Sequence, residues 1–243
     1  MKLSDILEQT KDSLIISDAF TKADSILNHK GYKNIACSVS GGADSDIMID
    51  ICEKVKPHSV HYVWFDTGIE YQATKEHLKY LEERYDITIE RERAIVPVPT
   101  SNRMYGEPFL SKFTSQCISR LQAHNFDWKD EPFEVALERF PKCKSALRWF
   151  NNNNYGDGKH KYSRFNIDSQ KYLREFLIAH PPTFKISDAC CKGAKKDVSK
   201  KYIKEHKIDL MLVGIRKAEG GVRAGAYSNC FSSEGKYKET NLS

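Results

Sequence analysis

The chain has 243 residues, 40% of them hydrophobic, which is enough for a large buried core and argues against a disordered chain. Its 38 Lys and Arg against 33 Asp and Glu give a net charge of +5, too low to indicate nucleic-acid binding by itself. No apolar stretch approaches the roughly 20 residues of a membrane helix, and Asp5 and Glu8 do not fit a signal peptide. We therefore expect a soluble cytoplasmic protein with no membrane partner.

Strands and helices alternate over the first 91 residues. The N-terminus reads as a capped amphipathic helix, and helical spacing continues to Gly31. The elements expected next are strand 34–39, a helix after Gly42, strand 59–65, helix 74–85 and strand 86–91. The helix after Gly42 is expected to bury Ile47, Ile51 and Val55. This β-α-β-α-β order predicts an α/β fold with a doubly wound, mainly parallel sheet.

The alternation breaks from about residue 96 to about residue 182. Prolines, helical segments at 133–140 and 169–180, and a polar run at 151–161 predict an inserted helical region with a solvated loop. Regular elements then return as a short extended segment at 183–187, a Lys-rich helix from about Ala194 to His206, and an apolar strand at 209–214. We interpret residues 1–243 as a single domain that contains this insert.

The first strand meets its helix in Ser40–Ser45, with the sequence SGGADS. A helix start carries unpaired N–H groups and the positive end of the helix dipole, which together suit a phosphate. Gly41 and Gly42 would let the backbone adopt positive φ and approach a ligand closely. Asp44 either caps the helix or engages Mg²⁺ that also holds the phosphates. The predicted phosphate-binding residues are Ser38, Ser40, Gly41, Gly42, Asp44 and Ser45.

This loop resembles the SGGxDS pyrophosphate-binding loop of the adenine nucleotide alpha hydrolase superfamily, the PP-loop ATP pyrophosphatases. It differs from a Walker loop, because no Gly-Lys-Ser/Thr follows. The alternative is a glycine-rich turn that binds nothing. The resemblance implies that residues 1–243 form a PP-loop nucleotide-binding domain.

A second motif, Asp66-Thr67-Gly68, follows the second strand at the carboxyl edge of the sheet, where open α/β folds bind ligands. It resembles the DTG element of the phosphoadenosine phosphosulfate (PAPS) reductase family and of the sulfate adenylyltransferase small subunit. By that resemblance, Asp66 contacts ribose or a metal, and Gly68 makes room for the nucleotide. Taken alone, DTG is a common turn.

A third motif, LVGIRKAEGGVRAG, follows the last predicted strand. Arg216 and Arg223 lie in a glycine-rich loop, and guanidinium groups suit phosphate or sulfate oxygens. The family has a similar loop, matched here by Gly214, Arg216, Glu219 and Arg223. The alternative is a pair of surface arginines in salt bridges.

Seven cysteines, an odd number, argue against a fully paired secreted framework. Cys190 and Cys191 precede Lys192, and we expect nearby lysines to stabilise their thiolates. The segment resembles the CC-x-x-x-K segment of the family, which in some members provides two ligands of a [4Fe–4S] cluster, with a downstream C-x-x-C providing the others. This chain has no C-x-x-C; Cys143 and Cys230 would complete the set, and ordinary thiols are the alternative.

The cysteine-containing tail of PAPS reductases does not appear before the final KYKETNLS, so we expect that tail to be missing. The sequence predicts an enzyme of sulfur metabolism that binds ATP or PAPS with Mg²⁺ and acts at the α-phosphate or its sulfur substituent. Asp44, Arg216 and Arg223 are the candidate catalytic residues. The alternatives are a sulfurtransferase-type ATP pyrophosphatase that modifies nucleic acid and a catalytically idle nucleotide-binding module. Besides an adenine nucleotide, the partners considered are a thiol or thioredoxin-type reductant, nucleic acid and further copies of the chain.

Overall fold

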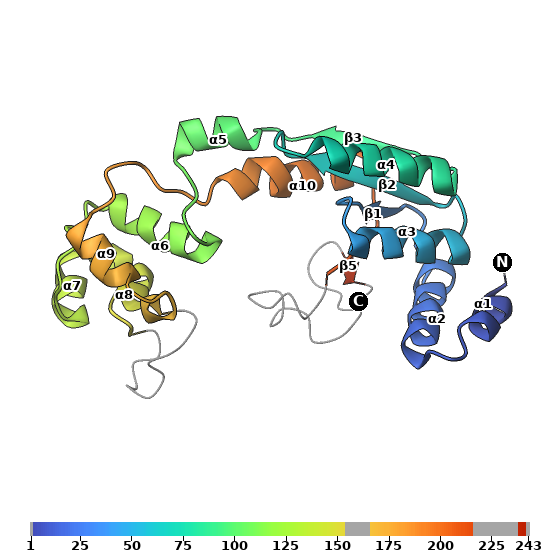
Figure 1. The fold of residues 1–243 in the computed structure, drawn as a ribbon, viewed down its shortest axis with the longest axis horizontal. Coiled ribbons are helices and arrows are strands. Elements are labelled where there is room, and N and C mark those ends of the chain that lie inside the picture. Colours follow the sequence, from blue (N-terminus) through green and yellow to red (C-terminus); the bar gives the residue numbers. More distant parts are fainter. Residues whose placement is uncertain (1, 154–165, 216–237, 242–243) are drawn as a thin grey trace. The chain divides into compact units, whose positions relative to one another are not determined.

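The computed structural model describes residues 2–153, 166–215 and 238–241 (Figure 1). Its contacts divide the chain into two compact units. The first unit consists of Met1–Ile95 and Ala194–Ser243, and the second is Val96–Gly193. The insert predicted for about 96–182 therefore corresponds to a unit that begins at the same residue and extends to Gly193.

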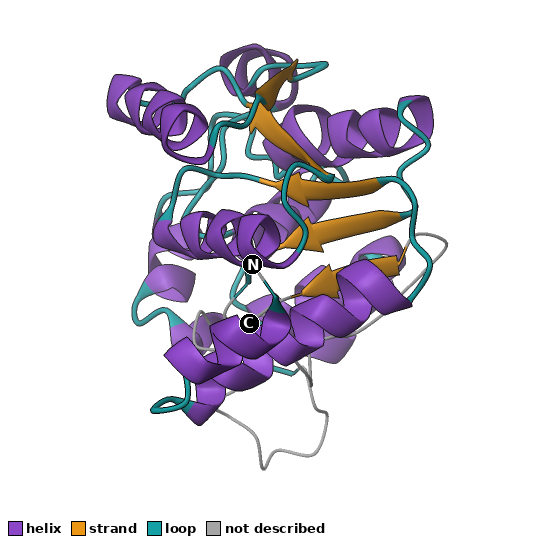
Figure 2. Cartoon of the chain, turned by 90° about the vertical axis from the view of Figure 1, so that its right-hand side faces the viewer, coloured by secondary structure: helices purple, strands orange, loops and turns teal. Residues whose placement is uncertain are grey.

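The first unit contains a five-stranded sheet in which every neighbouring pair is parallel (Figure 2). Its strands are β1 (Ile35–Ser38), β2 (Val60–Asp66), β3 (Ile89–Arg93), β4 (Leu210–Val213) and β5 (Lys238–Asn241). The strand order is β3-β2-β1-β4-β5. The predicted doubly wound α/β fold is confirmed, and the order reverses direction between β1 and β4, which is where such sheets bind ligands.

Strand β1 lies at the centre of this sheet. Ile35 pairs with Val60 on one side and with Leu210 on the other. Ile35, Ala36 and Cys37 are fully buried, because both faces of a central parallel strand are covered. This burial explains the nearly continuous apolar sequence of the strand.

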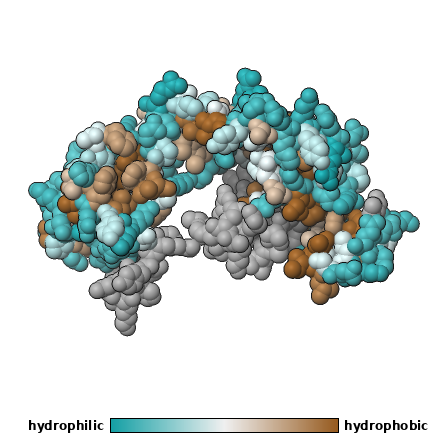
Figure 3. Space-filling model, in the orientation of Figure 1, coloured by the Kyte–Doolittle hydropathy of each residue, from teal (hydrophilic) through white to brown (hydrophobic). Residues whose placement is uncertain are grey.

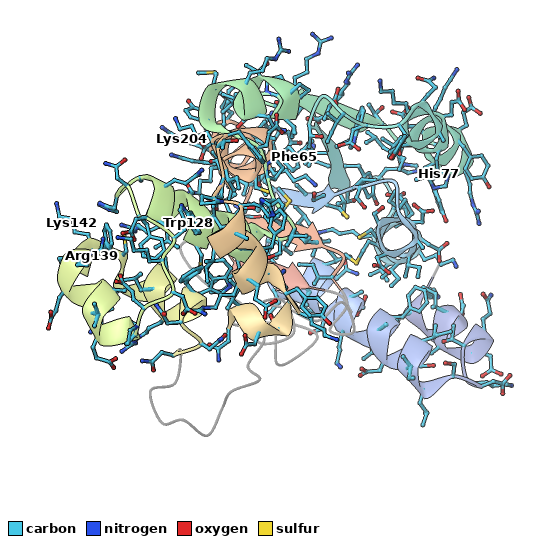
Figure 4. All side chains as sticks on the ribbon, turned by 60° about the vertical axis from the view of Figure 1, so that its left-hand side comes forward. Phe65, His77, Trp128, Arg139, Lys142 and Lys204 are labelled. Carbon is cyan, nitrogen blue, oxygen red and sulfur yellow. The ribbon has the colours of Figure 1, made fainter. Side chains whose placement is uncertain are left out.

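Helices cover both faces of the sheet. On one face, α2 (Leu14–His29), α3 (Ala43–Val55) and α4 (Gln72–Tyr85) share a core with Cys37 and Trp64. On the other face, α10 (Asp197–Glu205) packs Tyr202 and Ile203 against Val63 and Met211. Phe65 of β2 points toward α10, where its ring meets Tyr202 edge-on at 6.1 Å between centroids (Figure 4).

Two expectations about the helices of this unit were wrong. The N-terminal helical segment is two helices, because α1 (Leu3–Gln9) ends at Thr10 and Ser13 caps the start of α2. Ile47 of α3 is 58% exposed, whereas Ile51 is buried as expected and Val55 is partly buried. The buried residues of that helix are Ser45, Met48, Ile49, Ile51 and Cys52. The start of α2 is also apolar and exposed, with Leu14 and Ile15 at 85% and 84% (Figure 3).

The second unit is helical. Its α-helices are α5 (Val98–Tyr105), α6 (Lys112–Gln122), α7 (Phe133–Arg139), α8 (Lys144–Phe150) and α9 (Leu173–Ala179). A core that includes several aromatic rings joins α6, α7, α8 and α9. The ring of Phe126 lies edge-on to Trp128, Phe140 and Phe150, at 5.2–5.4 Å between centroids, and Trp128 is labelled in Figure 4. The extended segment 183–187 does not form a strand, because it makes a single isolated β-bridge, between Ile186 and Glu107.

The Lys-rich helix begins with a π-helical turn at Lys192–Lys196 and continues as α10. In the described part of the chain, no helix combines the length and the apolar character needed to cross a membrane.

Candidate nucleotide-binding site

The loop between β1 and α3 requires glycine at its tightest point. Gly41 adopts φ +74°, a left-handed conformation that residues with a side chain rarely take. A Cβ atom added at Gly41 would lie 2.9 Å from Cγ2 of Thr74 in α4. Gly42 is extended and precedes the first helical residue, Ala43. The glycine pair thus allows the chain to turn sharply beside α4 and enter α3.

The serines of this loop hold its backbone. Ser45 is 3% exposed, and both its hydroxyl and its amide donate to the carbonyl of Gly42, at 2.7 and 2.9 Å. The exposed Ser40 donates to Ser45 Oγ and accepts from the amide of Gly42, each at 3.4 Å. No described residue accepts from the amides of Gly41 or Ala43. Those N–H groups, at the positive end of the α3 dipole, are suited to bind an anion.

The end of β4 packs against the first turn of α3. Ser38, the last residue of β1, pairs with Val213, and Gly214 follows. A Cβ at Gly214 would lie 3.1 Å from the carbonyl oxygen of Asp44, so glycine permits this close approach. The structure therefore brings Ser38, the Ser40–Ser45 loop and Gly214 together at the carboxyl edge of β1 and β4.

Asp66 is engaged by protein groups on both oxygens. Its Oδ1 accepts from the amide of Gly68 at 2.9 Å, and its Oδ2 accepts from Arg91 Nε at 2.9 Å and also from Arg91 Nη2. Burial of the carboxyl group acts to raise the pKa of Asp66, but the hydrogen bonds from Arg91 and Gly68 outweigh it and lower that pKa. The guanidinium of Arg91 also lies 5.3 Å from the ring centroid of Trp64.

The pairing of Asp66 with Arg91 stabilises the DTG turn. Gly68 adopts φ +86°, and Thr67 Oγ1 donates to Glu70 Oε1 at 2.7 Å. Both carboxylate oxygens of Asp66 already accept hydrogen bonds. To contact ribose or a metal, an oxygen would have to give up its bond to Arg91 or Gly68, or bind the ligand in addition to it. Arg91 was not among the predicted site residues. The available signal was a charged residue in a predicted strand next to the one that ends at Asp66.

A second contact that the sequence analysis missed joins α3 to α4. His77 Nε2 lies 2.7 Å from Asp46 Oδ2, and the His77 ring stacks on Tyr80. Figure 4 shows the position of His77. Asp46 Oδ1 is buried with no hydrogen-bond partner among the described residues. Because Asp46 lies in the first turn of α3, this pair helps to fix that turn relative to α4.

Four residues of the predicted site lie outside the described part of the chain. They are Arg216, Glu219 and Arg223 of the arginine loop, and Cys230 of the predicted cluster. Their predicted roles stay predictions.

Three of the four cysteines predicted to hold an iron–sulfur cluster, Cys143, Cys190 and Cys191, are in the described part of the chain. Cys143 is fully buried, and its thiol donates to the carbonyl of Arg120 at 3.7 Å, while burial raises its pKa. Cys190 and Cys191 are half-buried, with 4.0 Å between their Sγ atoms. Burial and the neighbouring Cys191 raise the pKa of Cys190, contrary to the expectation of a stabilised thiolate. Across residues 2–153, 166–215 and 238–241, no three His, Cys, Asp or Glu side chains are placed to hold a metal.

Magnesium is compatible with the loop in one way. Mg²⁺ usually keeps several waters and binds through one or two carboxylates together with substrate phosphates. Asp44 could provide one such oxygen to an ion that arrives with the nucleotide, although the described residues contain no complete protein-only site.

Comparison with known proteins agrees with the sequence motifs. Residues 34–141 match the family model "Phosphoadenosine phosphosulfate reductase domain". The predicted resemblance to this family is thus confirmed over those residues. The matched range contains the Ser40–Ser45 loop, the DTG turn and Arg91.

Other comparisons add little. No curated protein matches the chain. One similar solved structure is the "NH3-dependent NAD synthetase from Campylobacter jejuni subsp. jejuni NCTC 11168 in complex with the nitrate ion". It is 13% identical over 84% of this chain and 96% of its own, with a TM-score of 0.35. A likeness this weak carries no inference about the site.

Proposed function

We propose that the protein is an enzyme that binds the phosphates of ATP or PAPS at the Ser40–Ser45 loop and acts at the α-phosphate or its sulfur substituent. The observation that carries the proposal is the start of α3. There the amides of Gly41 and Ala43 have no described acceptor, at the point where the strand order reverses. The family match over residues 34–141 supports an adenine nucleotide as the anion.

In this proposal the chain acts mainly by placement and electrostatics. The loop amides would hold the phosphate oxygens, and Asp44 would orient Mg²⁺ carried by the nucleotide, which neutralises charge at phosphorus. Arg216 and Arg223 are proposed to stabilise the charge that develops on the transferred group. Ser45 and Gly214 would act indirectly, because they support the loop and the first turn of α3.

The direct test is release of pyrophosphate from ATP, or of sulfite from PAPS with a dithiol such as dithiothreitol as the reductant, by the purified chain and by Asp44→Ala. We expect the wild-type chain to turn over one of these nucleotides and the variant to lose that activity while still binding the nucleotide. Unchanged turnover in Asp44→Ala would contradict the role of Asp44. Nucleotide binding with no turnover of either substrate by the wild type would favour the idle binding module.

Whether ATP or PAPS is the substrate can be separated by binding. A ligand that binds only the native state raises the melting temperature. A thermal-shift comparison of ATP, PAPS and AMP should therefore rank them. A larger shift with PAPS would favour the sulfonucleotide enzyme, for which a thiol or thioredoxin-type reductant is the proposed partner.

A second candidate function is an ATP pyrophosphatase that modifies nucleic acid, and one charge distribution favours it. Residues 192–207 contain seven lysines against Asp197 and Glu205, a net charge of +5 that equals the charge of the whole chain. Lys200, Lys201 and Lys204 are exposed on α10, and Figure 4 shows Lys204 projecting from it. Such a surface suits a phosphate backbone.

This second candidate predicts salt-dependent binding to an oligonucleotide duplex. Removing two phosphate contacts with Lys200→Gln/Lys204→Gln should reduce the slope of log affinity against log salt by about 1.8. The control is Lys54→Gln/Lys79→Gln, which changes the net charge equally at exposed positions of α3 and α4, on the opposite face of the sheet from α10. Equal slopes for the two double variants would exclude α10 as the binding surface.

A further inference from the structure

Two adjacent cysteines differ from the other described cysteines. Cys37, Cys52, Cys117 and Cys143 are buried, whereas Cys190 and Cys191 are each partly exposed. The Sγ atoms of this pair are 4.0 Å apart, which is contact distance for two sulfur atoms. Reagents in solution can thus reach the pair more readily than the other described thiols.

The backbone on both sides of the pair is held within the second unit. On the N-terminal side, Glu107 donates to the carbonyl of Lys185 at 2.9 Å and accepts from the amide of Ser187 at 3.0 Å. On the C-terminal side, the amide of Val96 donates to Gly193 at 3.4 Å, and a Cβ at Gly193 would lie 2.8 Å from Val96 Cβ. The segment is therefore anchored at both ends, close to the two thiols.

The chain between these anchors is not a regular α-helix. The amide of Lys192 donates to Ala189 at 2.9 Å, and a π-helical turn begins at Lys192. Single π-helical turns are rare, and those that occur often lie at functional sites. Neither cysteine belongs to the Ser40–Ser45 loop or to the DTG turn, so the proposed nucleotide site does not account for this segment.

We propose that Cys190 and Cys191 form a redox-active dithiol that closes reversibly to a disulfide. One thiolate attacks a sulfur of a low-molecular-weight disulfide, which releases one thiol and leaves a mixed disulfide. The other thiolate then attacks the protein sulfur of that mixed disulfide, forms the Cys190–Cys191 bond and releases the second thiol. The protein loses two protons and two electrons, and the small disulfide gains them as it becomes two thiols.

Covalent geometry makes this bond easy to reduce. Adjacent Cα atoms are about 3.8 Å apart, closer than the usual 4.4–6.8 Å or so between bridged cysteines. A disulfide between neighbours is consequently strained, and strained exposed disulfides are the labile ones. A dithiol reductant would return the pair to its reduced form by the reverse exchange.

The sequence provides a direct readout. Trypsin cuts after Lys185 and Lys192, so the peptide Ile186–Lys192, ISDACCK, contains both cysteines and no others. The full chain is incubated with glutathione disulfide, alkylated with iodoacetamide, digested and analysed by mass spectrometry. We expect this peptide to lose two hydrogens and to carry no alkyl group. Treatment with dithiothreitol before alkylation should restore two alkylated cysteines.

Buried Cys117, in the tryptic peptide Phe113–Arg120, is the internal control and should be alkylated only after unfolding. Cys190→Ser and Cys191→Ser each leave one thiol, and each should accumulate a mixed disulfide with glutathione. A wild-type peptide that keeps glutathione, that links two chains, or that remains doubly alkylated after oxidation would overturn the proposal. The readout does not involve nucleotide, so this result and the nucleotide-binding result can fail separately.

Discussion

The pair of Asp66 and Arg91 provides a quantitative test of how the DTG turn is held. Arg91→Gln removes the guanidinium. Among the described residues, this leaves the amide of Gly68 as the one hydrogen-bond donor to the Asp66 carboxylate, whose side chain is 8% exposed. Breaking a fully buried ion pair costs about 3–5 kcal/mol. Arg91 is 46% exposed, however, and solvent screening reduces the expected loss to about 1–2 kcal/mol.

The assay is urea unfolding followed by circular dichroism, with Arg93→Gln as the control. Arg93 is an exposed arginine two residues further along β3, so the two variants change the net charge and the strand equally. We expect Arg91→Gln to unfold at a clearly lower urea concentration than Arg93→Gln. In a thermal scan the loss corresponds to about 2–8 °C. Equal midpoints for the two variants would refute the view that Arg91 holds Asp66 in place.

Three further predictions follow from named contacts. Folding lowers the pKa of Asp66 below 3.8. The contribution of this carboxyl group to stability is therefore complete above its unfolded pKa and is lost as the pH falls through its folded pKa. The difference in unfolding free energy between wild type and Arg91→Gln should be constant near neutral pH and shrink below about pH 4. Gly214→Ala should weaken ATP binding, because its Cβ would press on the Asp44 carbonyl, and an affinity equal to wild type would show that this close approach is not needed. His77→Ala should lower stability by about 1 kcal/mol by leaving Asp46 unpaired, and His77→Gln should restore part of it; equal urea midpoints for wild type and His77→Ala would contradict this.

The sheet could be predicted because its inner strands are buried on both faces. Residues 34–39 and 209–214 show this as continuous apolar runs, and the elements between them alternate regularly. Strand β5 could not be predicted in this way, since Lys238–Asn241 has the sequence KETN and owes its place to pairing with β4. Local sequence carries no signal for such a partner.

In the site, too, local features were predictable from the sequence, and contacts between distant residues were not. The Ser40–Ser45 loop was predictable because Gly41 and Gly42 occur where a strand becomes a helix, a local feature of the chain. Arg91 and His77 were missed because their partners, Asp66 and Asp46, are 25 and 31 residues away in the sequence. Their contacts depend on the register of β2 with β3 and on the packing of α3 against α4. Ile47 was misplaced because several apolar residues in one helix allow more than one inward face.

The most direct test of the account is titration calorimetry of ATP binding to Gly41→Ala and Gly31→Ala. Both glycines have nearly the same positive φ, +74° and +75°, so alanine imposes a similar backbone cost at each. Gly31 has nothing within 4 Å of the added Cβ, whereas Gly41 shapes the loop that is proposed to hold the phosphates. We predict wild-type affinity for Gly31→Ala and a loss of about tenfold or more, at least about 1.4 kcal/mol, for Gly41→Ala. Equal affinity in the two variants, or no ATP or PAPS binding by the wild-type chain, would contradict the proposed site.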